Sequence, residues 1–226
     1  MRKYAVIVAG GSGSRMGGGI PKQFRTLCGK PVLWWSMKAF HDQDPDTKLI
    51  VVLPQEFIEH WSDLYNTLPK ADQFDHSITS GGVSRSESVT NGLALVDTED
   101  SLVAIHDGAR PLIDVSIIAK GWEEAGRNGG AIPVVAVTDS LRKLTSNGSE
   151  SVNRSEYVAV QTPQVFKTSL LKAAYDKSEG QIFTDDAAVM ENAGNTVSLF
   201  EGSPDNIKIT NPKDLAIAAV IMGEDG

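Results

Sequence analysis

The stretch AGGSGSRMGGGIPKQ, residues 9–23, combines bare backbone with two fixed positive charges. Glycine lets a ligand approach the backbone closely, and successive N–H groups in such a loop bind anions, most often phosphate. An arginine and a lysine seven residues apart would then close over a polyphosphate; the alternative is that both are solvated surface charges. The predicted phosphate-binding residues are Ala9, Gly10, Gly11 and Gly13, with Arg15 and Lys22 as the cations.

Two common phosphate-binding fingerprints do not fit this loop. The dinucleotide-binding pattern G-x-G-x-x-G, counted from Gly11, needs a glycine where Met16 stands. The G-K-[ST] ending of the ATPase phosphate loop is also missing. These mismatches disfavour a Rossmann dehydrogenase, and GGSG alone fits a plain tight turn equally well.

A carboxylate follows an apolar run at HDGARP, residues 106–111. Asp107 ends the run SLVAIHD, so we expect it at the carboxyl end of a strand. A carboxylate there would repel phosphate unless a divalent cation lay between them, and Mg²⁺ binds through one or two carboxylates plus phosphate oxygens. Asp107 is therefore the predicted Mg²⁺ ligand, with a loop or helix-capping carboxylate as the alternative. His106 is expected to be a packed strand-end residue, and Arg110 is either a substrate ligand or a structural ion-pair partner.

A second glycine turn, GGVSRSESV, begins at residue 81. Bare backbone at Gly81 and Gly82 could hydrogen-bond the edge of a nucleobase while leaving no room for a purine. Arg85 and Ser88 follow at the start of a helical pattern. Ser88 fits either a base contact or an ordinary position in the first turn of a helix.

These residues lie between short β-rich runs that alternate with longer segments of helical period. Such alternation, with nearly continuous apolar strands, predicts an α/β fold: a Rossmann-like three-layer sandwich with a mostly parallel twisted sheet. Ligands of such sheets bind beyond the carboxyl ends of the strands. The predicted strands are 4–9, 48–54, 101–107, 131–137, 156–161 and 196–202, and the predicted helices are 31–40, 55–68, 85–96, 115–128, 167–177 and 212–222.

One segment breaks the alternation. Residues 137–161 predict two extended strands around 146–149, with an Asn-Gly turn signal at 147–148. Because a polar hairpin of this length cannot bury itself, we expect it to project and to pack on a second copy of the chain. We therefore predict a single domain over residues 1–226, with a dimerisation arm at about 138–161 and a homodimer as the assembly.

Composition narrows the partners. The net charge of −8 over 226 residues argues against nucleic-acid binding, which needs a basic face. One cysteine, Cys28, excludes an internal disulfide and suits a reducing compartment. No apolar stretch approaches the length of a membrane span. We expect a soluble cytoplasmic protein with no membrane partner.

Taken together, the motifs resemble a known family. AGGSGSRM with PKQ is similar to the signature of sugar-nucleotide pyrophosphorylases and related nucleotidyltransferases. The further motifs GGVSRSESVTNGL, HDGARP, TDSLRK, QTPQVF, TDDAAVMENAG and DNIKITNPKDLAIA follow in the expected order. Over essentially the whole chain, they resemble the 2-C-methyl-D-erythritol 4-phosphate cytidylyltransferases of the non-mevalonate isoprenoid route.

The resemblance implies a nucleotide-diphospho-sugar transferase fold, CTP and methylerythritol phosphate as substrates, and Mg²⁺ as cofactor. It implies that Arg15 and Lys22 stabilise the reacting phosphates, that Asp107 binds the metal, and that Arg154 and Lys208 hold the acceptor's phosphate. The segment from Gly81 to Ser88, including Gly82 and Arg85, would read cytosine. The residues implied near the acceptor are Arg110, Ser140 and Thr162. If the arm swaps, Arg154 would complete the partner's site.

Two departures and two alternatives stay open. The family commonly has D-T-I-K where this chain has Asp139, Ser140, Leu141 and Arg142; serine keeps the hydroxyl, and Arg142 changes the geometry of the charge. The acidic residues of TDDAAVME, which are Asp185, Asp186 and Glu191, fit either a metal or a helix N-terminus. A ribitol 5-phosphate cytidylyltransferase is the alternative enzyme, and a non-catalytic nucleotide-binding protein of the same fold is the alternative class.

Overall fold

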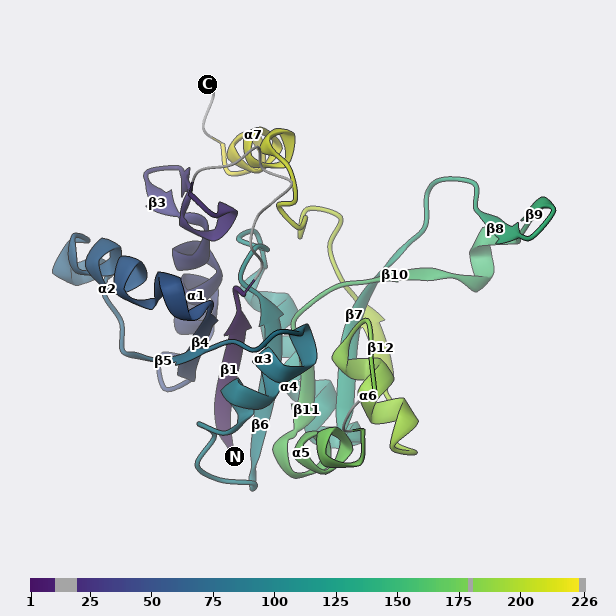
Figure 1. Cartoon of the computed structure of the whole chain (residues 1–226), viewed down its shortest axis with the longest axis horizontal. Coiled ribbons are helices and arrows are strands. Elements are labelled where there is room, and N and C mark those ends of the chain that lie inside the picture. Colours follow the sequence, from purple (N-terminus) through teal and green to yellow (C-terminus); the bar gives the residue numbers. More distant parts are fainter. Residues whose placement is uncertain (11–19, 179–180, 224–226) are drawn as a thin grey trace.

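The computed structural model describes residues 1–10, 20–178 and 181–223. A single large sheet has the strand order β10-β7-β11-β6-β1-β4-β5, and β12 pairs with β7 off this path. Figure 1 shows helices in front of and behind this sheet. The strands are β1 Arg2–Val8, β4 Lys48–Leu53, β5 His76–Ser80, β6 Ser101–Asp107, β7 Gly130–Ala136, β10 Val158–Val160, β11 Gln164–Lys167 and β12 Ser198–Glu201.

This sheet is mostly parallel. β6, β1, β4 and β5 run side by side in one direction, and β12 is parallel to β7. β11 is antiparallel to both β6 and β7, and β10 is antiparallel to β7. From β1 the chain moves outward to β4 and β5, then returns to place β6 on the other side of β1. The strand order therefore reverses between β1 and β6, which is where open α/β sheets bind their ligands.

One face of the sheet packs against α1, α2 and α4. These helices are Val32–Gln43, Ile58–Asn66 and Val115–Asn128. Their buried aromatics, Phe40, Trp61 and Trp122, join Ala5 and Ile7 of β1 in one apolar cluster. Caps fix the ends of α4: the side chain of Asp114 accepts the N–H of Ser116, and Gly129 ends the helix at φ 90°.

The opposite face packs against α3, α5 and α6. These are Arg85–Leu93, Thr168–Lys177 and Asp186–Asn192. Tyr4 and Val6 of β1 point to this side and join the second cluster, because successive side chains of a strand alternate between faces. Since both faces of β1 are covered, its run of apolar residues is continuous rather than alternating.

A cap of small elements sits beyond the carboxyl end of β1. It contains β2 Thr26–Leu27, β3 Lys30–Pro31 and α7 Pro212–Ile221. Ala218 of α7 packs with Leu27, Val32 and Ile209 in a small buried cluster, and Figure 1 shows α7 and β3 together at this end of the molecule. Four short 3₁₀ turns complete the described elements: Lys22–Phe24, Gln55–Phe57, Lys70–Asp72 and Arg154–Glu156.

The arm is a separate antiparallel hairpin of β8 Arg142–Thr145 and β9 Gly148–Ser151. Figure 1 shows it projecting away from the body of the molecule. Thr145 pairs with Gly148, so the turn lies at residues 146–147, one residue earlier than the Asn-Gly signal suggested. Gly148 instead follows the turn, with φ 135°.

The predicted fold class is confirmed, although the prediction missed two strands of the large sheet and the short strands β2 and β3. All six predicted strands and all six predicted helices have counterparts, and residues 185–186 begin the helix α6. Prediction missed β5 and the antiparallel β11. No helix within the described ranges is long and apolar enough to cross a membrane.

Candidate active site

Two cavities meet beyond the carboxyl ends of β1, β5 and β6. The first, of about 260 Å³, lies between the end of β1 and the turn before α3; the second, of about 310 Å³, lies on the side of β10 and β11. Arg85, Asp107 and Lys208 line both. The first also contains Ala9, Gly10, Lys22, Gly82 and Ser88, and the second contains Arg110, Thr162, Gln164, Thr184 and Asp185.

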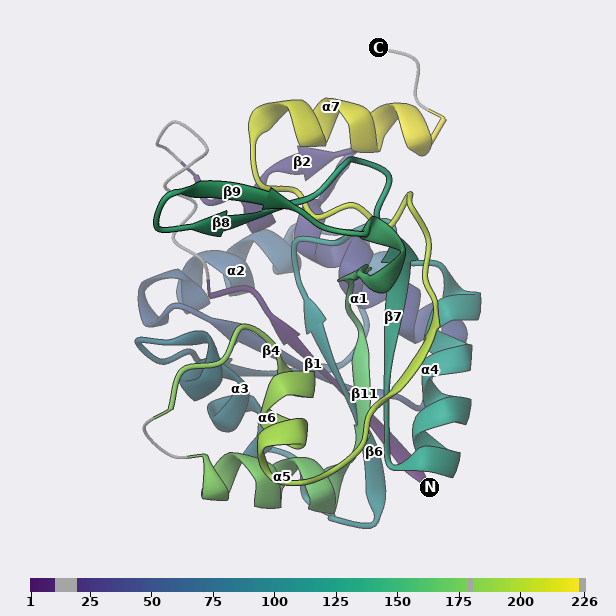
Figure 2. The same cartoon turned by 90° about the vertical axis from the view of Figure 1, so that its right-hand side faces the viewer.

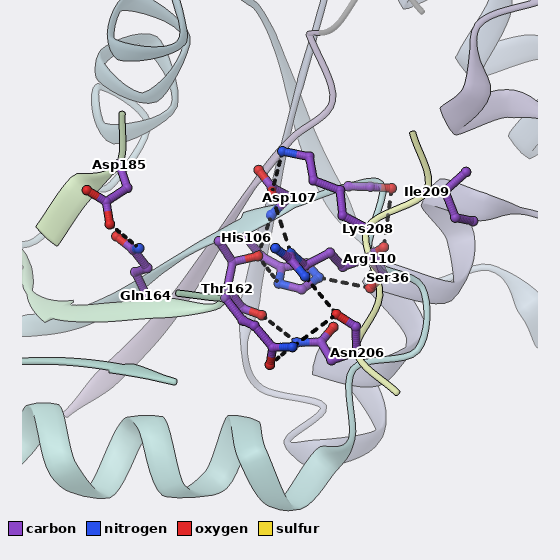
Figure 3. Close-up of polar contacts among 12 residues, drawn as sticks. Ser36, His106, Asp107, Arg110, Thr162, Gln164, Asp185, Asn206, Lys208 and Ile209 are labelled. Atoms are coloured by element: carbon purple, nitrogen blue, oxygen red, sulfur yellow. Dashed lines mark hydrogen bonds and ion pairs between the residues drawn. The ribbon is translucent and has the colours of Figure 1, made fainter. Parts of the chain in front are cut away.

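Asp107 is the carboxylate between the two cavities, and cations surround it (Figure 3). Its Oδ2 lies 2.9 Å from Nζ of Lys208 and 3.5 Å from Nε of Arg110. Burial alone would raise the pKa of Asp107, but the charges of Lys208, Arg85 and Arg110 outweigh it and lower the pKa to about 2. Asp107 is therefore ionised at neutral pH and can bind a cation.

Arg110 reaches this site through its ion pair with Asp107. Its NH1 donates to the carbonyl of Asn206 at 2.7 Å, while its buried Nε has no hydrogen-bond partner within the described ranges. Burial lowers the pKa of Arg110, although the guanidinium stays charged. Its Nε lies 3.5 Å from Oδ2 of Asp107, so the Arg110 guanidinium holds that carboxylate at the edge of the second cavity.

His106 positions the backbone of Asp107 from behind. Its Nε2 lies 3.2 Å from the carbonyl of Arg110, which can only accept, so Nε2 carries the proton. Nδ1 then accepts from Oγ1 of Thr162 at 3.1 Å, and the same oxygen accepts the N–H of Asp107 at 3.0 Å. Thr162 also precedes a cis peptide bond to Pro163. His106 is thus the packed strand-end residue that was predicted, and Thr162 lines the second cavity.

The glycine turn before α3 needs its glycines for close approach. A Cβ on Gly82 would lie 2.3 Å from Cβ of Glu87, and one on Gly81 would lie 2.9 Å from Oγ of Ser88. The N–H of Gly82 donates to Oγ of Ser88 at 3.1 Å, and that hydroxyl donates to the carbonyl of Ser84 at 2.9 Å. Ser88 therefore fixes the turn, and its hydroxyl has one further acceptor position toward the first cavity.

The loop after β1 contributes to the first cavity from the opposite side. The side chain of Gln23 donates to the carbonyl of Ala9 at 2.7 Å, which anchors the end of β1. Lys22 lines the cavity and donates from Nζ to the carbonyl of Ile209 at 2.7 Å. A Cβ on Gly10 would lie 3.5 Å from Oγ of Ser88, so the two glycine segments lie close together.

Other predicted residues are not assembled with this group. Gly11, Gly13 and Arg15 lie outside the described residues. Arg154 and Ser140 are exposed near the base of the arm and line neither cavity. The Arg154 guanidinium instead donates to the carbonyl of Thr138.

The acidic residues of TDDAAVME do not form a metal cluster. Asp185 caps α6 by accepting the N–H of Ala188, Asp186 is buried in an ion pair with Arg85, and Glu191 is exposed. Within the described ranges, no group of three or more His, Cys, Asp or Glu residues could hold a metal ion. The single carboxylate of Asp107 still fits Mg²⁺ that is held partly by the phosphates of a substrate.

Sequence reasoning missed the residues that support this site from other elements. Gln164 donates to Asp185 at 2.8 Å and accepts the N–H groups of Asp186 and Ala187. Asn206 supplies the carbonyl for Arg110 and donates to the carbonyl of Thr162 at 2.9 Å. Gln164 and Asn206 lie in the motifs QTPQVF and DNIKIT, which carry the family resemblance. Nothing in these motifs indicates which groups the two side chains contact.

A three-layer α/β sandwich with a glycine turn, a strand-end carboxylate and surrounding cations defines a nucleotidyltransferase class of site. Comparison with known proteins gives the particular family. The family model for 2-C-methyl-D-erythritol 4-phosphate cytidylyltransferase matches residues 4–224, and the chain belongs to this family.

Individual relatives agree with this assignment. The protein of that name from Phocaeicola vulgatus is 46% identical over 222 residues, which cover 98% of this chain and all of the relative. The one from Bacteroides fragilis is also 46% identical, with the same coverage. The crystal structure of the Thermus thermophilus cytidylyltransferase aligns with a TM-score of 0.77 at 32% identity over 98% of both chains. The Anaerococcus prevotii synthase aligns at 0.84 over 99% of both chains, and at 24% identity it supports the fold alone.

Proposed function

We propose which residues of this site bind each substrate and the metal in the reaction that the family carries out. The chain is a cytidylyltransferase: it transfers CMP from CTP to 2-C-methyl-D-erythritol 4-phosphate, giving 4-diphosphocytidyl-2-C-methyl-D-erythritol and pyrophosphate in isoprenoid biosynthesis. One observation supports the assignment of roles: Arg85, Asp107 and Lys208 line both cavities, so two substrates can meet over them.

CTP occupies the first cavity in this proposal. Gly82 and Ser88 line this cavity, and the turn that Ser88 holds would contact the edge of cytosine. The triphosphate extends toward Lys22 and the glycine loop at residues 10–13. Arg15 has the role of a second cation on this loop.

The acceptor occupies the second cavity, with its phosphate facing the first. Lys208 holds this phosphate as a point charge, and the Arg110 guanidinium, which lines this cavity, is a further cationic contact for the acceptor. Ser140 and Thr162 are proposed as further polar contacts.

The reaction is then an in-line displacement at the α-phosphorus of CTP. A phosphate oxygen of the acceptor forms the new P–O bond while the bond to the β-phosphate oxygen breaks and pyrophosphate leaves. A phosphate monoester is already ionised and nucleophilic at neutral pH, so no residue needs to remove a proton. Catalysis consists of holding two polyanions together and stabilising the spreading charge, which the cluster of cations does.

Asp107 is the proposed ligand of Mg²⁺. Its low pKa keeps it ionised, and one carboxylate with phosphate oxygens is the ligand set that this metal prefers. When bound, the ion would neutralise phosphate charge. The residue's present partners, Lys208 and Arg110, would then be released toward the substrates' oxygens.

A homodimer would bring Arg154 into the site. Leu144 on β8 is 83% exposed. Val158 and Val160 on β10, and Tyr157 just before that strand, are each at least 40% exposed. Burying these side chains against a second copy would stabilise the arm, and the arm's Arg154 would then face the partner's acceptor cavity. We place the enzyme in the cytoplasm because its single cysteine suits a reducing compartment.

Pyrophosphate release tests the function. The purified protein is given CTP and Mg²⁺, with methylerythritol phosphate and ribitol 5-phosphate offered in parallel. We expect turnover with methylerythritol phosphate alone, and Lys208→Ala should chiefly raise the KM for this acceptor. Turnover with ribitol phosphate alone would overturn the acceptor, and tight CTP binding without pyrophosphate release would favour a binding protein of the same fold.

A further inference from the structure

A buried carboxylate outside the reacting groups contacts the arginine that lines both cavities. Asp186 is fully buried, and its Oδ2 accepts from NH2 of Arg85 at 2.6 Å. Its Oδ1 accepts from the hydroxyl of Tyr175, also at 2.6 Å. Both oxygens of Asp186 therefore have a partner.

The surroundings fix this carboxylate rigidly. Asp186 is the first residue of α6, and its N–H donates to Oε1 of Gln164 on β11 at 3.0 Å. Tyr175 belongs to α5, and Arg85 is the first residue of α3. These three helices cover the same face of the sheet, as Figure 2 shows, so the contact joins elements that are far apart in the sequence.

The guanidinium of Arg85 is bound on one side only. Its side chain is 28% exposed and lines both cavities, whereas Asp186 is fully buried. Within the described ranges, its side chain makes one hydrogen bond, to Asp186, through one of five N–H donors. The remaining donors are available to anionic oxygens at the junction where the two substrates meet.

We interpret the ion pair of Asp186 and Arg85 as fixing the orientation of Arg85 rather than as stabilising the fold. Burying an ion pair costs desolvation that apolar residues would avoid, so such pairs are poor stabilisers of a fold. Burial, followed by the charge of Asp186, raises the pKa of Tyr175, so its hydroxyl keeps its proton and donates at all physiological pH values. Tyr175 thereby holds one carboxylate oxygen while the other orients Arg85.

We propose that Asp186 and Tyr175 are positioning residues that aim the free N–H donors of Arg85 at phosphate oxygens at the junction of the two cavities. The inference rests on the proposed function, because it takes the phosphates of CTP and of the acceptor as the ligands. It assigns Asp186 a role in phosphate recognition without contact with either substrate.

Three variants and a double-mutant cycle test this role. Asp186→Asn keeps the shape but removes the charge, Tyr175→Phe removes one hydroxyl, and Arg85→Met removes the guanidinium. We expect Asp186→Asn to lower kcat/KM by about 10- to 100-fold, the loss typical of misplaced charged groups in active sites, and Tyr175→Phe by about threefold. In the Arg85→Met background, both losses should shrink to less than about twofold, because coupled residues are not additive.

A chemically matched cluster far from the cavities serves as control. The carboxylate of Asp97 accepts from the hydroxyl of Tyr4 and from NH1 of Arg2, near the amino end of β1. Asp97→Asn and Tyr4→Phe should leave kcat and both KM values unchanged. Thermal melts followed by circular dichroism show which variants are folded.

The possible results distinguish a failure of the positioning role from a failure of the proposed function. Equal losses with and without Arg85 would overturn the positioning role, as would full activity of folded Asp186→Asn. If Asp186→Asn does not fold, Tyr175→Phe decides: full activity overturns the proposal, and a loss that depends on Arg85 supports it. Absence of pyrophosphate release by the wild type would instead refute the proposed function.

Discussion

The buried imidazole of His106 makes the stability of this protein depend on pH in a defined window. Burial lowers the pKa of His106 to about 4, against about 6.5 in an unfolded chain. Protonation would place a charge in a fully buried position and would give Nδ1 a proton where it now accepts from Thr162. The unfolded state therefore binds the proton more tightly, and stability is lost as the pH falls below the unfolded pKa.

The size of this loss follows from the two pKa values. Linkage gives a decrease in the free energy of unfolding of about 2 kcal/mol at pH 5 and about 3 kcal/mol at pH 4, relative to pH 7.5. Such a loss is a large fraction of the stability of a typical domain, about 5–15 kcal/mol. Asp107, with a pKa of about 2, stays ionised in the folded protein throughout this range; its own contribution to stability is lost as the pH falls through the unfolded pKa of 3.8 toward 2, so it adds little above pH 4.

Urea denaturation at pH 7.5, 6, 5 and 4 measures this dependence. His106→Gln removes the titrating group while keeping one donor and one acceptor, so its curve serves as reference and subtracts other ionisations. The difference in stability between wild type and variant should narrow by about 2–3 kcal/mol on acidification. Parallel curves from pH 7.5 to 4 would refute the buried, neutral imidazole, whatever the absolute stability of the variant.

Three further outcomes are expected from the site. Lys22→Ala should lower kcat at least tenfold, measured by pyrophosphate release, because a cation beside the phosphates is lost; normal kcat would contradict its role. At an acceptor concentration too low for either variant alone to turn over, mixing Lys208→Ala and Arg154→Ala subunits should restore about a quarter of wild-type activity if the arm completes the partner's site, since half of randomly formed dimers carry one intact site; no recovery would place Arg154 in its own chain's site or outside the reaction. Gly82→Ala should weaken CTP binding in calorimetry because its Cβ lies 2.3 Å from a side-chain atom, whereas Gly126→Ala on α4, with its nearest contact at 3.9 Å, should bind CTP normally.

The sequence predicted the parts of the site that lie next to a strand or a glycine turn. Asp107 ends an apolar run, so its place at the strand's carboxyl end followed from the pattern, and the structure bears this out. The turn at Gly81 and Gly82 was marked by its composition. Such features are local, since a few neighbouring residues determine them.

Prediction failed where distant contacts decide the structure. β11 is four residues long, and it forms because it fits antiparallel between β6 and β7. β5 is only half-buried at the sheet edge, and its polar residues hide the strand pattern. Asp186, the partner of Arg85, lies 101 residues away on α6, and no spacing in the sequence indicates that Tyr175 of α5 would reach Asp186.

The charge around Asp107 explains why an acidic protein can bind two polyanions. The chain carries a net charge of −8, yet Lys22, Arg85, Arg110 and Lys208 gather around the two cavities. Without substrate, Asp107 satisfies two of these cations and lowers the cost of burying them near one another. A phosphate oxygen, or an ion bound to Asp107, can then take over this pairing. The same side chains therefore keep the empty site stable and provide positive charge when the substrates arrive, which a group of unpaired cations could not do.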